Sequence, residues 1–415
     1  MQANTVLKRP DSYCETGKTG PSTGGWKGKE ERSKCVIYVA NTSWYLYNFR
    51  LALMEKMVND GWRVIAVAPR DRYSCRLEGR DIHYYSLPMS RKGANPIVDI
   101  VLLYRLYRLY VKEQPALVHH FTLKPVIYGT IAARMAGVAS IVNALTGLGY
   151  VFSSKRAKAR LLRSVISRAI RCIMDAENIR VIFQNPDDRD VFVSPDLLNP
   201  AHTVLIRGSG VDVDKFTPSP ECEGHPVVLL CARMLRSKGV DELVVAARHL
   251  RELNIPGQII LAGESDPGNP EAIPEEQLRQ WNEEGTVRWL GHKENMSEVY
   301  AYAHIVVLPS RDREGVPRTL IEAAACGRAI VATDVPGCRE IVRHGENGLL
   351  VPAGNAEALS LALKTLMEDP YLRLQMGAKS REIAVSEFSQ ENVINSTLKV
   401  YAGLCGRILR DGDSF

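Results

Sequence analysis

Short apolar runs alternate with segments of helical periodicity from residue 35 onward. CVIYVAN (35–41) has the composition of a buried strand, and residues 44–60 then carry apolar side chains at helical spacing. The same order repeats through VIAVAP (64–69), a strand at 83–87, a helix at 96–114, ALVHHF (116–121), a helix at 125–136, SIVNALTG (140–147), a long helix and VIFQN (181–185). Apolar strands separated by helices predict a parallel sheet that is covered on both faces.

One stretch interrupts this alternation. TVLIRGSGVDVDKFTPSP (203–220) holds two glycines, alternating Asp and Val residues and a Pro/Ser segment, which is typical of an interdomain linker. The alternation resumes at PVVLLCA (226–232) and continues through QIILAGE, VRWLG, IVVLPS, AIVATD and GLLVPAG. The pattern therefore predicts an α/β protein of two Rossmann-like parallel-sheet domains, with ligands bound in a cleft outside the C-terminal ends of the strands.

These patterns divide the chain into five parts. The first part is rich in Gly, Ser, Thr, Lys and Glu, lacks the apolar core of a signal peptide and is expected to be disordered. The last part contains an amphipathic segment, 390–409, that is long enough to pack back across the first domain. The predicted parts are an extension (1–34), a first domain (35–207), a linker (208–224), a second domain (225–389) and a C-terminal helix (390–415).

Composition limits the number of domains, the state of the cysteines and the presence of membrane spans. The 415 residues are enough for two domains with separate cores, and the 45% hydrophobic and 24% charged residues are ordinary for a soluble globular protein. Nine cysteines without a CxxC pair favour reduced thiols in a cytosolic setting over a disulfide framework or a zinc site. No apolar run reaches the roughly 18–20 residues that a membrane span needs.

The stretch IVVLPSRDREGVPRTLIEAAACG (305–327) carries the strongest candidate chemistry. It predicts a buried strand, a polar loop and a helix that is entered at Pro317 and closed by Gly327. A helix N-terminus offers unpaired N–H groups and a positive dipole end, which suit a diphosphate. Glu314 and Glu322 bracket this junction, and their carboxylates can accept hydrogen bonds from sugar hydroxyls. The stretch therefore predicts a nucleotide-sugar site.

Two cations complement that stretch. Arg233 and Lys238 follow a predicted strand end with the spacing RxxxxK, and at the mouth of a cleft they would neutralise a diphosphate leaving group. Taken alone, such a pair is more typical of a solvated basic turn, but the glutamate pair opposite favours the diphosphate site. The glutamates also have a plain alternative, in which one is favoured by the helix dipole and the other is merely exposed. A glycoside hydrolase also uses two carboxylates, but here the two positions suit different parts of one ligand.

The pair Asp212 and Asp214 has the spacing of a DxD motif, which can hold a metal ion and a nucleotide diphosphate. It lies inside the predicted linker, so we interpret it as structural. We expect no metal and no other cofactor, with cationic side chains and helix N–H groups taking the place of a metal ion's charge.

At these motifs the chain resembles the retaining glycosyltransferases of family four (glycosyl transferases group 1), which have the two-domain GT-B fold. The first half matches through NFR, HFTLKPVIYG, TGLGY and GVD. The matching segments of the second half are ARMLRSKGVDEL (232–243), LAGE (261–264), GHKENMSEVY (291–300), EGVPRTLIEAAACGRAIVATDVPG (314–337) and ENGLLVPAGN (346–355). Within the family the chain is most similar to bacterial lipid-linked-sugar N-acetylhexosaminyltransferases.

The resemblance implies roles for particular residues. Arg233 and Lys238 would hold the diphosphate, Glu322 the ribose and Glu314 the donor sugar. The residues implied to bind the donor are Arg233, Lys238, Glu264, Met296, Glu314, Gly315, Thr319, Leu320 and Glu322. Those implied to bind the acceptor are Asn41, Lys124, Thr146 and Tyr150.

The candidate catalytic residues are Glu314, Arg233, Lys238 and His120. His119 and His120 end a first-domain strand, where the cleft is expected to open. The family often has HxH here, with the second His near the reaction centre. Alignment through Lys124 places His119 at the first of these positions and Phe121 at the second, which departs from the family pattern. The N-terminal loop NTSWYLYNFR is also bulkier than the family's glycine-rich turn.

The main charge asymmetry lies near residues 155–171. Apolar residues at helical spacing accompany seven positive charges there, which is typical of a basic amphipathic helix on an anionic membrane surface. In the plain alternative, the apolar side packs on the sheet and the cations are solvated. RNA is a weaker option, and no nucleic acid is expected, since nothing resembles a nucleic-acid module. The cations are Lys155, Arg156, Lys158, Arg160, Arg163, Arg168 and Arg171.

These observations predict an enzyme that moves a hexose or N-acetylhexosamine from a UDP-sugar to a polyprenyl-diphosphate-linked saccharide. The family resemblance implies that the anomeric configuration is retained. We expect the enzyme to act in surface-polysaccharide or glycoprotein-glycan assembly, on the cytoplasmic face of the cell membrane as a peripheral protein. Two alternatives stay open at this point: a nucleotide-sugar 2-epimerase of the same fold, and a non-catalytic membrane-associated scaffold.

Overall fold

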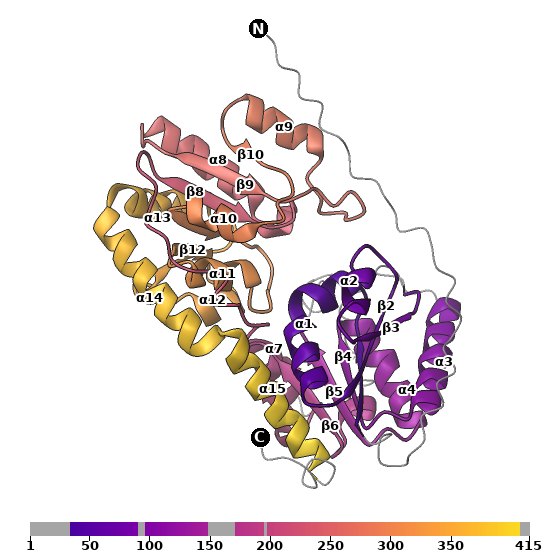
Figure 1. Cartoon of the computed structure of the whole chain (residues 1–415). Helices are drawn as coiled ribbons and strands as arrows, with labels where there is room; N and C mark the ends of the chain where they lie inside the picture. The colour runs from indigo at the N-terminus through magenta and orange to yellow at the C-terminus, as the bar shows by residue number, and fades with distance from the viewer. Residues whose placement is uncertain (1–33, 90–95, 148–170, 195–196, 407–415) are drawn as a thin grey trace.

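The computed structural model describes residues 34–89, 96–147, 171–194 and 197–406. Two parallel sheets form the framework, each within its own half of the chain (Figure 1). The first sheet has seven strands in the order β3-β2-β1-β4-β5-β6-β7. Its strands are β1 (Cys35–Val39), β2 (Arg63–Ala68), β3 (His83–Ser86), β4 (Leu117–Phe121), β5 (Ser140–Leu145), β6 (Ile179–Phe183) and β7 (Thr203–Leu205).

Helices cover both faces of the first sheet. The described helices are α1 (Ser43–Asn59), α2 (Ser74–Glu78), α3 (Pro96–Glu113), a π-helical turn (Pro125–Gly129) continued by α4 (Thr130–Met135), α7 (Pro186–Val193) and a 3₁₀ turn (Pro200–His202). Because side chains alternate along a strand, Ile37 faces a core shared with α3 and α4, whereas Tyr38 faces a core shared with α1. The doubly covered α/β sheet predicted from the sequence is confirmed.

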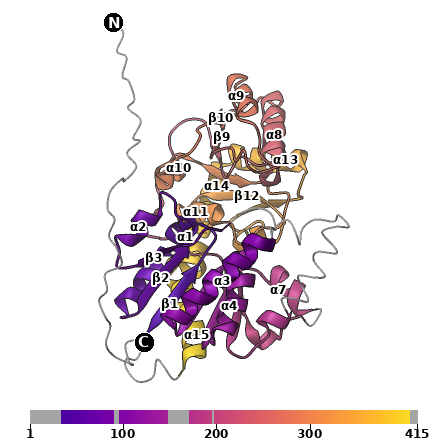
Figure 2. The same ribbon diagram turned by 90° about the vertical axis from the view of Figure 1, so that its right-hand side faces the viewer.

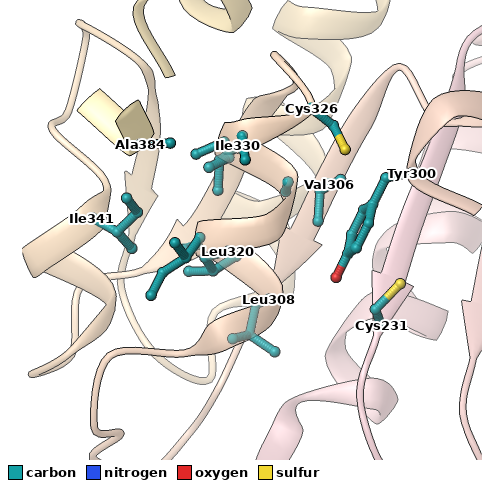
Figure 3. Packing of buried hydrophobic residues seen from close by; sticks show 14 of the residues in the cluster. Cys231, Tyr300, Val306, Leu308, Leu320, Cys326, Ile330, Ile341 and Ala384 are labelled. Carbon is teal, nitrogen blue, oxygen red and sulfur yellow. The ribbon is translucent and has the colours of Figure 1, made fainter. Parts of the chain in front are cut away.

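The second sheet repeats this arrangement with six strands in the order β10-β9-β8-β11-β12-β13. The strands are β8 (Val227–Cys231), β9 (Gln258–Ala262), β10 (Arg288–Trp289), β11 (Ile305–Leu308), β12 (Ala329–Thr333) and β13 (Gly348–Val351). Its helices are a 3₁₀ turn (Arg236–Lys238), α8 (Val240–Glu252), α9 (Glu275–Glu283), α10 (Met296–Tyr302), α11 (Arg318–Ala325), α12 (Cys338–Ile341), α13 (Ala356–Glu368) and α14 (Pro370–Phe388). Apolar side chains of β8, β11, α10, α11 and α14 pack together on one face, with Leu320 and Tyr300 among them (Figure 3).

Two chain segments cross between the halves and pair with each other. Residues 203–205, at the start of the segment whose pattern is typical of a linker, form the edge strand β7 on β6 and so belong to the first sheet. After β7, the N–H of Val211 donates to the carbonyl of Phe388, and the N–H of Gln390 donates to the carbonyl of Val211. Ser389 separates α14 from the last helix, α15 (Gln390–Cys405), and caps it. Helix α15 then packs on the first domain (Figures 1 and 2).

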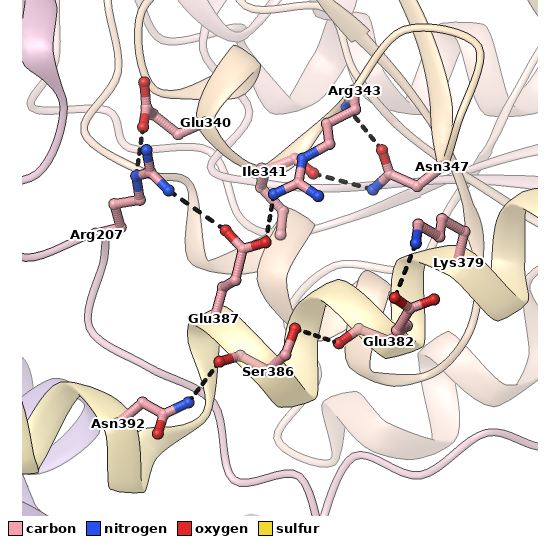
Figure 4. Close-up of polar contacts among 10 residues, drawn as sticks. All are labelled: Arg207, Glu340, Ile341, Arg343, Asn347, Lys379, Glu382, Ser386, Glu387 and Asn392. Atoms are coloured by element: carbon pink, nitrogen blue, oxygen red, sulfur yellow. Dashed lines mark hydrogen bonds and ion pairs between the residues drawn. The ribbon is translucent and has the colours of Figure 1, made fainter.

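Ion pairs secure this crossing. Arg207, the residue before the linker, pairs with Glu340 of α12 at 2.9 Å and with Glu387 of α14 at 3.3 Å. Arg343 pairs with the other carboxylate oxygen of Glu387, so one acidic side chain joins two arginines (Figure 4). These contacts connect the end of the first domain to the helices of the second.

Candidate active site

The candidate site lies where the second sheet reverses its strand order, beside β8 and β11. Loops at the C-terminal ends of these adjacent strands carry Arg233 and Lys238 on one side and Glu314 on the other. Such a switch point is where open α/β sheets bind their ligands. The loop after β8 can approach β11 because Gly239 has φ +73° and lies against the carbonyl of Pro309, so that a Cβ there would overlap that oxygen.

Lys238 and Glu314 form the centre of this site. The Nζ of Lys238 pairs with Oε1 of Glu314, and the Oγ of Ser310 donates to the same oxygen at 2.6 Å. Both charged side chains are largely buried, so the ion pair limits the cost of keeping them there. A bound diphosphate would compete with Glu314 for the ammonium group, and sugar hydroxyls would take up the carboxylate in turn.

Arg233 lies further out. Its side chain is 55% exposed and pairs with Asp266 at 2.9 Å. An exposed pair of this kind contributes roughly 0–1 kcal/mol, so Arg233 can exchange Asp266 for a phosphate at little cost. Glu264, two residues before Asp266, is exposed after β9, and its carbonyl accepts the N–H of Met234 at 2.9 Å.

Glu322 occupies a different environment inside α11. Only 7% of the residue is exposed. Its Oε1 accepts from Nε of Arg318 at 2.7 Å, and its Oε2 accepts from the hydroxyl of Tyr300 at 3.2 Å. Burial raises the pKa of Tyr300 well above its usual value, so this phenol stays a protonated donor. A carboxylate has about four lone-pair sites, which leaves Glu322 acceptor capacity for the two hydroxyls of a ribose.

Helix α11 brings its N-terminus to the same loop. Pro317 is its N-cap residue and provides no side-chain hydrogen bond, so no side chain competes with a ligand for the first-turn N–H groups. Thr319 is half-buried in that turn, and Leu320 is buried in the core beneath it (Figure 3). Met296 begins the neighbouring helix α10 and packs against the same core.

Gly315 marks the contact with the first domain. A Cβ at this position would overlap the side-chain oxygen of Gln184 and the carbonyl oxygen of Thr146. The N–H of Val316 donates to Oε1 of Gln184 at 3.1 Å, and Nδ2 of Asn185 donates to the carbonyl of Glu314 at 3.2 Å. The C-terminal ends of β5 and β6 therefore meet the loop after β11.

Sequence reasoning missed Gln184, Asn185 and the salt bridge between Arg313 and Asp188, which is 3.0 Å long. A signal for the first two was present, because a Gln-Asn pair directly follows the apolar strand VIF. Their role could not be derived, since it depends on which loop of the other domain they face.

The implied acceptor residues do not gather in the same way. Asn41 is half-buried after β1. Lys124 is in an ion pair with Asp99 at 2.9 Å, and Asp99 also accepts from the hydroxyl of Tyr128 at 3.0 Å. The carbonyl of Thr146 lies against Gly315 of the second domain. Tyr150 and all of the predicted basic helix near 155–171 except Arg171 lie outside the described residues.

His120 does not reach the other candidate catalytic residues. Its Nε2 bonds to the hydroxyl of Tyr110 at 2.9 Å and its Nδ1 to Oδ1 of Asn143 at 2.8 Å, within the core under α3 and α4. Burial lowers the pKa of His120 to about 4, so the ring is neutral at pH 7. The physical reason is that side chains alternate along a strand. His120 points to the same face as Val118, which is covered by α3 and α4, whereas its neighbour His119 points to the opposite face.

His119 lies on the side of the sheet that borders the second domain. Its Nδ1 bonds to the hydroxyl of Tyr401 in α15 at 2.6 Å. The ring lines a small cavity together with Thr146, Gln184 and Gly208. Burial and the nearby cation Arg50 hold the pKa of His119 well below its usual value. Of the two histidines, His119 is therefore the one beside the interdomain contact.

The Asp212–Asp214 segment forms a turn. Oδ1 of Asp212 accepts from the N–H of Asp214 at 3.1 Å and from that of Lys215 at 3.0 Å, so its carboxylate closes the local backbone. Within the described parts of the chain, no three His, Cys, Asp or Glu side chains are grouped in a way that could hold a metal ion.

The two parallel-sheet Rossmann-like domains have the GT-B architecture, and the matching family models indicate a glycosyltransferase. Residues 213–383 match the family "Glycosyl transferases group 1", and residues 35–184 match the family "Glycosyl transferase 4-like". The two matched segments correspond to the two sheets, which confirms the family and the fold class predicted from the sequence.

Among its relatives is the N,N'-diacetylbacillosaminyl-diphospho-undecaprenol alpha-1,3-N-acetylgalactosaminyltransferase of Campylobacter jejuni. It is 26% identical over 379 residues, which cover 88% of this chain and 98% of the relative. The UDP-Gal:alpha-D-GlcNAc-diphosphoundecaprenol alpha-1,3-galactosyltransferase of Escherichia coli is 24% identical over 322 residues, 74% of this chain and 80% of that one. The structure of Anabaena Alr3699/HepE in complex with UDP and glucose has the same fold, with a TM-score of 0.73, 18% identity and coverage of 89% of this chain and 99% of that one.

Proposed function

We propose that this glycosyltransferase moves a hexose or N-acetylhexosamine from a UDP-sugar to a hydroxyl of a polyprenyl-diphosphate-linked saccharide. The observation that carries the donor half of this proposal is the Lys238–Glu314 pair beside the uncapped N-terminus of α11, with Glu322 buried one turn further along. The acceptor half is supported by the relatives from C. jejuni and E. coli, whose names describe diphospho-undecaprenol-linked sugars.

In this proposal Arg233, Lys238 and the first-turn N–H groups of α11 bind the diphosphate and stabilise the charge that develops as it leaves. Glu322 accepts from the ribose hydroxyls, and Glu314 accepts from the donor sugar after Lys238 has turned to the phosphates. No metal ion is required, because the cations and the helix end supply the positive charge.

We propose that the anomeric configuration is retained by attack on the face from which UDP leaves. The bond between the anomeric carbon and the diphosphate oxygen breaks, and the acceptor oxygen bonds to that carbon from the same side. The acceptor's proton passes to the leaving phosphate, so no side-chain base is needed. His120 has no part in this step, since it is enclosed by Tyr110 and Asn143 in the first-domain core.

A peripheral position on an anionic membrane completes the proposal, and helix α3 supports it. Ile100 is 64% exposed, and further apolar side chains lie exposed on the same side of the helix. Its exposed cations are concentrated in the second half, where they would meet lipid headgroups while the apolar half enters the boundary of the acyl chains. The exposed apolar residues include Val98, Ile100, Val101 and Tyr104, and the exposed cations are Arg105, Arg108 and Lys112. No helix in the described ranges is both long and apolar enough to cross a bilayer.

The decisive experiment is an incubation of the purified protein with a panel of UDP-sugars and a bacterial membrane lipid extract. We expect a glycolipid one sugar heavier by mass spectrometry, and an α-anomeric product by NMR when the donor is α-linked. Release of free sugar alone would contradict the transferase proposal. Conversion of the donor in the absence of lipid would favour a 2-epimerase, and no turnover together with unaltered lipid binding in Glu314→Ala would favour a scaffold.

A further inference from the structure

Arg318 stands where local electrostatics disfavours a cation. It is the first residue of α11, at the positive end of the helix dipole. It also precedes its partner Glu322 by four positions, which is the weaker order for an i,i+4 ion pair. Residues that break such local rules are expected where function compensates for the cost.

The side chain of Arg318 joins the two domains. Its Nε donates to Oε1 of Glu322 at 2.7 Å. One of its terminal N–H groups donates to the carbonyl of Asn48 in α1, and the guanidinium lies 5.0 Å from the centre of the Phe49 ring. A planar guanidinium can bond in its plane and stack on its face at the same time, which a lysine ammonium cannot do.

The same contacts fix the direction of the Glu322 carboxylate. Arg318 holds one carboxylate oxygen and Tyr300 the other, at 2.7 Å and 3.2 Å. Without Arg318, a buried carboxylate would keep only a neutral phenol as partner, so its orientation would relax and its charge would lose compensation. The position of the remaining lone pairs, which a diol would use, therefore depends on Arg318.

We propose that Arg318 is a positioning residue, which aims Glu322 at the nucleotide and makes nucleotide affinity depend on the contact between α11 and α1. This inference rests on the proposed function, in which Glu322 accepts from the ribose. By thermodynamic linkage, UDP binding then strengthens the contact of Arg318 with Asn48 and Phe49 to the same degree.

A second interdomain arginine provides a matched control. Arg313 lies in the loop that precedes α11 and pairs with Asp188 of α7 at 3.0 Å. It bridges the same two domains, but its ion pair does not involve Glu322. Removing it tests whether nucleotide affinity responds to any lost interdomain salt bridge or specifically to the one that includes the carboxylate.

The experiment is isothermal titration of the full chain with UDP. We expect Arg318→Met to weaken binding about tenfold and Arg318→Lys by less, because lysine restores only the charge. Phe49→Leu, which touches no nucleotide in this proposal, should weaken binding about threefold. The double variant Arg318→Met/Phe49→Leu should bind as Arg318→Met does, since both changes break one link. Arg313→Met should change the affinity less than twofold.

The outcomes separate the two levels of the proposal. If Glu322→Gln loses affinity but Arg318→Met and Arg318→Lys bind like the wild type, the positioning role is wrong and the proposed site stands. Additive effects of Phe49→Leu and Arg318→Met, or an equal loss in Arg313→Met, would overturn the link to α1. If the wild type does not bind UDP, or Glu322→Gln binds it unchanged, the proposed donor site itself fails. Thermal unfolding of each variant checks its fold, and Arg318→Lys and Phe49→Leu carry the test if Arg318→Met is unstable.

Discussion

The two halves of the molecule have nearly the same sheet but use their strand ends differently. In the second half, the loops after β8 and β11 bring opposite charges together in Lys238 and Glu314, with the end of α11 beside them. In the first half, the corresponding polar residues are engaged within the domain: Lys124 with Asp99, and His120 with Tyr110 and Asn143. The second half thus has a site defined by side chains, whereas the first half contributes mainly a surface.

The largest effect is expected at the ion pair between Lys238 and Glu314. We expect Lys238→Ala and Glu314→Ala each to lower kcat about 10²–10³-fold, because each removes a charge aimed at the leaving group or the sugar. The measurement is initial rate against UDP-sugar concentration. The surface pair Lys364–Glu368 of α13 supplies the control, and Lys364→Ala should retain the wild-type rate. A wild-type rate in Glu314→Ala would show that the charged pair is structural.

Arg233 should show a smaller effect of a different kind. Its exchange of the exposed Asp266 for a phosphate adds binding in both the ground state and the transition state. We therefore expect Arg233→Ala to raise KM for the donor about tenfold, as loss of a charge-assisted contact does, while kcat falls less. Arg233→Lys should recover part of the loss. An unchanged KM in Arg233→Ala would exclude this residue from the donor site.

The second half was also the more predictable one. Glu314, Glu322, Arg233 and Lys238 follow directly from a strand–loop–helix pattern, since the ends of adjacent parallel strands must meet at one edge of the sheet. The alternation of strands and helices likewise predicted the order of elements in each sheet, and the amphipathic segment 390–409 predicted the last helix. These features depend on local sequence and on general rules of α/β folds.

The features that could not be predicted depend on residues far away in the sequence. The sequence shows two adjacent histidines, but only the register of β4 decides which one faces α15 and which one faces α3. Arg318 is likewise one of several arginines near the start of α11, and its contact with Asn48 and Phe49 follows from how the domains meet. The edge strand β7 was not predicted either, because TVL (203–205) carries no sign that β6 needs an edge partner.

A third prediction concerns the surface of the first half. We expect Ile100→Glu to weaken binding to anionic vesicles severalfold, since a charge replaces an apolar side chain at the lipid boundary. Binding is measured by co-sedimentation with vesicles of phosphatidylglycerol and phosphatidylethanolamine. The control is Leu374→Glu on α14 of the second half, where an apolar side chain is 56% exposed. Equal losses in both variants would remove the distinction between the halves. An unchanged binding of Ile100→Glu would remove α3 from the membrane surface.

The smallest expected effect concerns His120. It tests whether this residue stabilises the fold or takes part in the reaction. The pKa of His120 in the folded protein is lowered to about 4, below the ordinary value of 6.5, because its ring is buried. Between pH 6.5 and pH 4 the unfolded chain therefore binds more protons at this residue, and the free energy of unfolding falls as the pH falls. From pH 7 to pH 5 this single group should lower the free energy of unfolding by about 1–2 kcal/mol.

In His120→Gln the thermal midpoint should drop less over that range than in the wild type, although it starts lower at pH 7. His119 shifts in the same direction and stays in the variant, so part of the acid sensitivity persists. A pH dependence of stability identical to that of the wild type would mean that His120 is not held neutral by the core. A selective loss of kcat in a stable His120→Gln protein would return this residue to the reaction.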